Sequence, residues 1–246
     1  MKKTNYSYIG ISFIILVFGI YFIPKIIDRI KNHDVTRNES RSDFAGENNI
    51  KLSDLAFIEI NGEPKQAPHF SFINQDGKTI TNDDYKDMVY IVEFFFTTCP
   101  TICPRMNANL IQIQNSFKDY KNFGVASFTI NPEHDTPEVL KAYAEKYGVS
   151  NPYWNLMTGD QDAIYKLANQ GFNLYTAKEE SVEGGFEHSG NFALIDKNGF
   201  IRSRVVNGNP IIFYNGMISQ TEKVDDEGMS EEITILKEDI AKLLKE

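Results

Sequence analysis

Residues 94–104 read Phe-Phe-Phe-Thr-Thr-Cys-Pro-Thr-Ile-Cys-Pro, and this stretch holds both cysteines of the chain, Cys99 and Cys103. An apolar, aromatic run ends at the first thiol, and a proline follows each thiol. This order predicts a buried strand that leads into the start of a helix. Side chains four residues apart lie on one face of a helix, so the two thiols can share a metal or oxidise to a disulfide.

The segments around this stretch alternate between strand and helix patterns. A near-continuous apolar run predicts a central strand that is covered on both faces. The expected elements are a hairpin over 70–80, the central strand over 87–96, a helix over 102–117, a strand over 124–130, helices over 137–147 and 160–168, a hairpin over 192–205 and a last helix after 230. Such alternation predicts an α/β sheet with helices on both faces, and a dithiol at a strand-to-helix junction makes the thioredoxin-like variant the best fit.

Composition narrows the class of protein. The chain has 246 residues, with 25 Lys+Arg against 34 Asp+Glu, which gives a net charge of −9. A chain this acidic is not expected to bind nucleic acid. Because there are only two cysteines in a chain of this length, a scaffold held together by disulfides is excluded, and the cysteine pair is functional or local.

The N-terminus predicts a membrane anchor. Residues 8–23 carry no charge, although this run is a little short of the ~20 residues usual for a spanning helix. A cleaved signal peptide is the alternative, but no small-x-small cleavage site follows Ile23. We therefore expect a single membrane-spanning helix over residues 1–24, a polar tether over 25–66 and a thioredoxin-like domain over 67–246.

The expected location is a bacterial inner membrane, with the folded domain outside the cytoplasm. Basic residues after the apolar run outnumber those before it, which by itself favours the reverse orientation. A short tail ahead of a large domain is nevertheless typical of a signal anchor. The Arg-rich, acid-poor presequence of a mitochondrial protein is absent.

Two thiolates are typical ligands of Cu(I), zinc or iron–sulfur clusters. An iron–sulfur cluster normally needs four thiolates, and structural zinc needs four ligands. Cu(I) is satisfied by two thiolates and one imidazole, which this chain can supply. One residue more than the usual Cys-x-x-Cys spacing weakens the prediction of disulfide exchange. A pair of buried structural cysteines is the plain alternative.

Four histidines could supply the imidazole, and no two of them have the His-x3–5-His spacing of a zinc site. His33 lies in the expected tether, His69 precedes the first hairpin, and His134 precedes a helix. His188 lies in a glycine-bracketed loop before the second hairpin, a loop that faces the dithiol in thioredoxin-like folds. On these grounds His188 is equally well interpreted as a ligand or as a surface residue.

With these residues the chain resembles the Sco/SenC family of copper chaperones for cytochrome c oxidase assembly. The resemblance extends from about residue 67 to the last helix and is carried by the segments 94–104, 131–140, 154–159, 187–189 and 194–196. It implies that Cys99, Cys103 and His188 bind copper, as Cu(I) and in a second state as Cu(II). It also implies that the dithiol can cycle through a disulfide.

The same resemblance implies the partners: the copper-site subunit of cytochrome c oxidase, other copper carriers or thiol reductants, and a membrane through the N-terminal helix. Two positions depart from the family pattern. Glu187 stands where the family often has aspartate, and His134 stands where it often has arginine. A glutamate can still accept a hydrogen bond from the metal-binding imidazole. The change at His134 is expected to affect partner contacts rather than metal binding.

Other functions remain open at this point. A membrane-tethered thiol–disulfide reductase needs the same two sulfurs as a copper chaperone. A peroxidase of the peroxiredoxin type is disfavoured because no general arginine partner for the reactive cysteine is evident. A structural adaptor would leave Cys99 and Cys103 unexplained.

Overall fold

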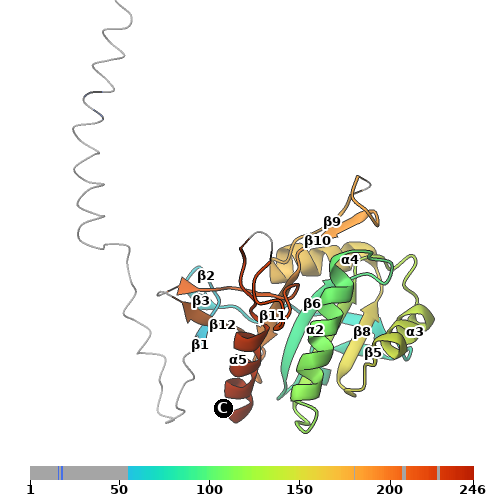
Figure 1. The fold of residues 1–246 in the computed structure, drawn as a ribbon, viewed down its shortest axis with the longest axis horizontal. Coiled ribbons are helices and arrows are strands. Elements are labelled where there is room, and N and C mark those ends of the chain that lie inside the picture. The colour runs from blue at the N-terminus through green and yellow to red at the C-terminus, as the bar shows by residue number, and fades with distance from the viewer. Residues whose placement is uncertain (1–15, 17, 19–54, 180, 207–208, 226–227) are drawn as a thin grey trace, which may run out of the picture. The chain divides into compact units, whose positions relative to one another are not determined.

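The computed structural model describes residues 16, 18, 55–179, 181–206, 209–225 and 228–246. Residues 51–246 form one folded unit. In this unit a central sheet lies between helices, as Figure 1 shows. The predicted α/β class is therefore confirmed.

The sheet of the described segments has ten strands, and its main path runs in the order β1-β12-β11-β6-β7-β8-β4-β5. The three central strands β6, β7 and β8 are parallel, whereas the strands outside them pair antiparallel. On the main path the strands are β1 (Leu55–Phe57), β4 (Ser71–Asn74), β5 (Thr79–Thr81), β6 (Val89–Phe95), β7 (Phe123–Thr129), β8 (Trp154–Thr158), β11 (Asn191–Ile195) and β12 (Ile201–Val206). β13 (Asn209–Pro210) pairs with β12, and β14 (Tyr214–Asn215) pairs with β11.

Two groups of helices cover the two faces of this sheet. The helices are η2 (Asn82–Tyr85), α2 (Ile102–Ser116), α3 (Pro137–Tyr147), α4 (Gln161–Lys166), the π-helix η3 (Leu167–Phe172) and α5 (Ile233–Lys245). Successive side chains of a strand point to opposite faces. Phe95 contacts Tyr143 of α3, with ring centroids 5.5 Å apart, and α2 packs against both α3 and α5. On the other face the ring centroids of Phe94 and Phe172, a residue of η3, are 6.2 Å apart.

The core forms around β6, as its apolar sequence predicts. All seven residues of β6 and all seven of β7 are buried, because helices cover both faces of these strands. Helix α3 begins where predicted: the Thr136 hydroxyl accepts from the Val139 N–H, and Gly148 ends the helix in the left-handed conformation, with φ of 79°. Because β6 and β7 are parallel and pair along their whole length, their C-terminal ends lie side by side, and the chain runs from the end of β6 into α2.

The folded domain begins before residue 67, so the last part of the predicted tether over 25–66 is wrong. β1 pairs with β12, and β2 (Glu59–Ile60) pairs with β3 (Glu63–Pro64) in a small hairpin. Strands of two or three residues are too short for an alternating pattern to reveal them.

The predicted anchor over residues 1–24 lies outside the described residues, apart from Leu16 and Phe18. The parts of the chain that the structure describes contain no helix with the length and apolar character needed to span a bilayer.

Candidate metal and thiol site

The two cysteines lie where β6 gives way to α2. The Cys99 N–H donates to the Phe96 carbonyl, 3.2 Å away, which closes a tight turn after the strand. The N-cap residue of α2, Thr101, makes no side-chain capping bond; instead the Cys99 sulfur receives the backbone N–H of Cys103 at 3.5 Å. A helix N-terminus favours negative charge, so this position stabilises a thiolate on Cys99.

His188 faces the cysteines from the other side. It ends β10 (Phe186–His188), which pairs antiparallel with β9 (Thr176–Lys178), so the loop expected around it is a strand. Its Nε2 lies 3.1 Å from the Cys103 sulfur, and its Nδ1 lies 3.1 Å from the Ser189 carbonyl oxygen. If Nδ1–H donates to that carbonyl, Nε2 is left free to accept a thiol proton or to bind a metal.

The structure thus brings together the three residues singled out as ligands. The sulfurs of Cys99 and Cys103 and a ring nitrogen of His188 all lie within 4.8 Å of one another, and all three residues are buried. Two thiols and an imidazole form a donor set that suits a soft metal such as Cu(I). Within the described segments no fourth histidine, cysteine or carboxylate joins this cluster.

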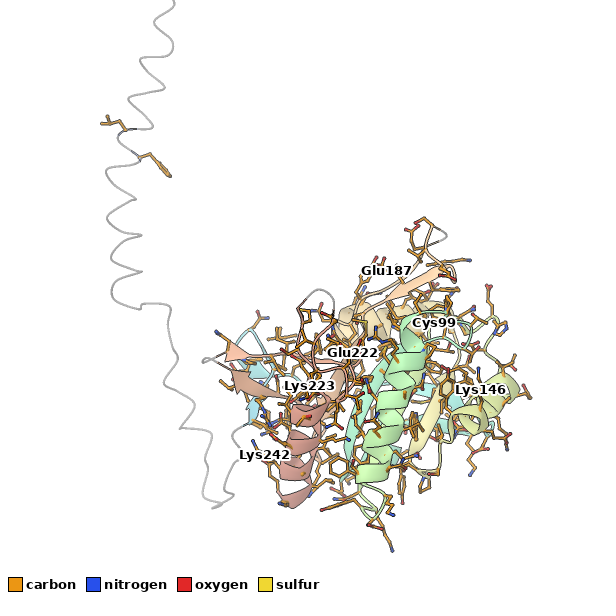
Figure 2. The ribbon with its side chains drawn as sticks, in the orientation of Figure 1. Cys99, Lys146, Glu187, Glu222, Lys223 and Lys242 are labelled. Carbon is orange, nitrogen blue, oxygen red and sulfur yellow. The ribbon has the colours of Figure 1, made fainter. Side chains whose placement is uncertain are left out.

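A pocket of about 240 Å³ leads to Cys99. Its walls are formed by the turn after β6, the start of α2 and the β9–β10 hairpin, with Phe96, Ile102, Val182 and Phe186 among its apolar residues. Cys99 is 8% exposed, whereas Cys103 is fully buried. In Figure 2 Cys99 lies at the N-terminal end of α2, with Glu187 on the nearby hairpin. A partner would therefore reach the Cys99 sulfur first.

The two thiols differ in acidity. Hydrogen bonds from Cys103, His188 and the Thr101 backbone hold the pKa of Cys99 well below its ordinary value. Burial raises the pKa of Cys103, and the adjacent Cys99 sulfur and the Glu93 carboxyl raise it further. The pair therefore combines a more acidic thiol that borders the pocket with a less acidic thiol that is fully buried.

Glu93 is a residue near the site that sequence reasoning missed. It lies on the central strand β6 and is 1% exposed; one carboxyl oxygen accepts from the Ser127 hydroxyl at 2.5 Å. The other oxygen has no hydrogen-bond partner within the described part of the chain. Burial raises the pKa of Glu93 to about 7. A lone glutamate inside an apolar strand run was the signal that could have identified it.

The other described residues that the sequence singled out are not part of the sulfur–imidazole cluster. Glu187 is exposed and lines the pocket beside Cys99, and the Ser189 carbonyl oxygen lies at Nδ1 of His188, in the acceptor role expected of Glu187. His134 contacts Asp135 at 2.8 Å rather than the thiols. His69 lines a separate pocket of about 630 Å³, and His33 lies outside the described residues.

A dithiol at a strand-to-helix junction, faced by an imidazole, defines a metal-binding or thiol-exchanging protein of thioredoxin-like fold. The SCO1/SenC family matches residues 59–220, and the chain belongs to this family. The resemblance noted in the sequence is thereby confirmed.

Known relatives agree with this assignment. A SCO1 protein homolog of Bacillus subtilis (strain 168) is 35% identical over 132 residues, which cover 53% of this chain and 68% of that protein. The crystal structure of a SCO1/SenC family lipoprotein from Bacillus anthracis str. Ames is 31% identical and matches 73% of this chain and 95% of its own, with a TM-score of 0.60.

The solved structure of BsSco, a member of the Sco family of cytochrome c oxidase assembly proteins, has a TM-score of 0.58 at 27% identity. It covers 73% of this chain and 94% of its own. These neighbours confirm the thioredoxin-like fold.

Proposed function

We propose that this chain binds copper through Cys99, Cys103 and His188 and acts as a metallochaperone rather than primarily as an enzyme. The observation that carries the proposal is the buried cluster of two sulfurs and one imidazole nitrogen within 4.8 Å. Thiolates select Cu(I), and the imidazole also suits Cu(II), so both oxidation states are compatible with this donor set. Structural zinc would call for a fourth ligand.

The receiver of the copper, in this proposal, is the copper-site subunit of cytochrome c oxidase. The support is membership of the SCO1/SenC family and likeness to BsSco, a member of the Sco family of cytochrome c oxidase assembly proteins. The protein either delivers copper to that subunit or prepares its copper-site cysteines. Other copper carriers or thiol reductants would load or reduce the chain beforehand.

A thiol–disulfide reductase is the second candidate, and the unequal thiols favour it. An accessible sulfur with a lowered pKa can attack a partner disulfide, and a buried second thiol can then resolve the mixed disulfide. Both roles use the same two sulfurs, and a Cys99–Cys103 disulfide cannot bind Cu(I) as the dithiol does. Copper loading and oxidation should therefore exclude each other.

Cytochrome c oxidase activity in a bacterial strain that lacks the protein separates the two roles. We expect low activity that added copper restores at least in part, because free copper bypasses a missing carrier. Restoration by an external thiol reductant, but not by copper, would favour the reductase instead. Normal oxidase activity under copper limitation would contradict both roles.

We also propose that residues 1–24 anchor the protein in a bacterial inner membrane, with the folded domain outside the cytoplasm. The apolar run supports the anchor, and the lipoprotein relative from Bacillus anthracis supports a membrane-associated domain. Protease added to spheroplasts should digest the folded domain, because a domain outside the cytoplasm is exposed to the protease. A protected domain would show that the orientation is reversed, and a mature chain that lacks residues 1–23 would refute the anchor.

A further inference from the structure

Asp135 is a fully buried carboxylate in the loop between β7 and α3, and no role proposed above uses it. Its Oδ2 accepts from the Thr97 N–H at 3.0 Å and from the Thr129 hydroxyl at 2.5 Å. Its Oδ1 accepts from the Thr97 hydroxyl and lies 2.8 Å from Nδ1 of His134. One carboxylate thus joins the end of β6 to the end of β7.

The bonds to Thr97 connect Asp135 to the thiols. Thr97 lies two residues before Cys99, and both its backbone N–H and its hydroxyl are held by the same carboxylate. The turn that follows is fixed at its other end by the bond from the Cys103 N–H to the Cys99 sulfur. Residues 97–103, which we call the cysteine turn, are therefore held between Asp135 and the first turn of α2.

A buried carboxylate is costly unless hydrogen bonds compensate for lost hydration. No lysine or arginine of the described segments forms an ion pair with Asp135, and the ring beside it is that of the half-exposed His134. The compensation comes from the two threonines and this imidazole. Asparagine at this position would keep one acceptor oxygen and replace the other with an NH2 donor, which would face donors that now bind Oδ1 or Oδ2, so the turn would lose part of its attachment.

We propose that Asp135 is a positioning residue for the thiol pair: through Thr97 it holds Cys99 at the distance from Cys103 that allows both sulfurs to bind one metal or to join in a disulfide. Its relevance to copper rests on the proposed function, but its effect on the two sulfurs does not. Two reactive groups that are held close together react as if at high local concentration. Release of the turn should lower that concentration.

The metal-free reaction with glutathione measures this positioning. The two thiols and glutathione disulfide give a Cys99–Cys103 disulfide and two glutathione thiols, so both electrons and both protons pass to glutathione. For the purified full chain with Asp135→Asn, we expect the equilibrium constant for this reaction to fall by about tenfold or more. Thr97→Val should lower it in the same direction, whereas Thr97→Ser, which keeps the hydroxyl, should restore it to within about twofold of wild type.

Thr129→Val is the matched control, because it removes the other hydroxyl bound to Asp135 and leaves the cysteine turn attached. It should lower thermal stability while the glutathione equilibrium stays near the wild-type value. An equilibrium unchanged in both Asp135→Asn and Thr97→Val would overturn the proposal. A shift in Thr129→Val as large as that in Thr97→Val would also overturn it, since Asp135 would then only join two strands.

Copper uptake by the same variants keeps this proposal separate from the proposed function. If the wild-type chain takes up no copper while Asp135→Asn still shifts the glutathione equilibrium, the copper function fails and the positioning role stands. If copper is bound normally and the glutathione equilibrium does not respond to Asp135→Asn or Thr97→Val, the positioning role fails alone.

Discussion

Replacement of both Cys99 and Cys103 by serine is expected to abolish tight Cu(I) binding, from about one copper per chain to background. Serine hydroxyls stay protonated near neutral pH and are hard donors, so they do not replace soft thiolates. Copper per chain after equilibration with a competing Cu(I) chelator is the measurement. Circular dichroism of the metal-free variant shows whether the fold is retained. Stoichiometric, tight copper in the double variant would remove Cys99 and Cys103 from the metal site.

Within the same experiment, His188→Ala should weaken Cu(I) binding less than the loss of the cysteines does. Mutation of groups that merely orient a ligand costs about 10- to 100-fold in affinity, so loss of the imidazole itself should cost at least about tenfold. Cu(II) binding should suffer more, because imidazole suits Cu(II) well. His134→Ala is the matched control, since that imidazole contacts Asp135 rather than a sulfur. Equal effects of the two variants would contradict the assignment of His188.

The second large effect concerns Glu93: the free energy of unfolding of the reduced, metal-free protein should fall as the pH rises from about 5 to 8. Burial raises the pKa of Glu93 from 4.5 to about 7, so the folded state holds a proton that the unfolded state has lost. The resulting stability is fully present below about pH 4.5 and is lost as the pH rises through about 7. The shift corresponds to roughly 3 kcal/mol.

Urea unfolding at several pH values, for wild type and for Glu93→Gln, tests this expectation. Glutamine can keep a hydrogen bond with Ser127 but cannot ionise, so the pH slope should flatten in this variant. Glu145→Gln is the matched control, because Glu145 is exposed and its loss should leave the slope as it is. A slope equally steep in Glu93→Gln and wild type would show that other groups cause it.

The cysteine turn could be predicted from the sequence because it is built from neighbours along the chain. The apolar run before Cys99, the prolines and the four-residue spacing act within one strand and one helical turn. The same holds for the long elements: β6, α2 and α3 have enough residues for their hydrophobic periodicity to stand out. The α/β class followed from the order of these elements.

The third candidate ligand needed more than the spacing of residues. His188 is 85 residues beyond Cys103, and its Nε2 comes to 3.1 Å from the sulfur where the β9–β10 hairpin packs its Phe186 and His188 rings against Phe96. Family resemblance singled it out, while residue patterns left a ligand and a surface residue equally open. The strand at β1 escaped prediction for a similar reason, since its three residues form a strand by pairing with β12 far along the chain.

What the sequence by itself determined was therefore local: a strand that ends at Cys99, a helix that carries Cys103, and a fold class set by the order of such elements. Tertiary structure alone decided the surroundings of the thiols. Asp135 reaches Thr97 across 38 residues, and the Glu93 pKa depends on the helices packed over β6. Burial and hydrogen bonds between distant segments arise only when the chain is folded, so the distances and pKa shifts of the site could not be predicted from spacing along the chain.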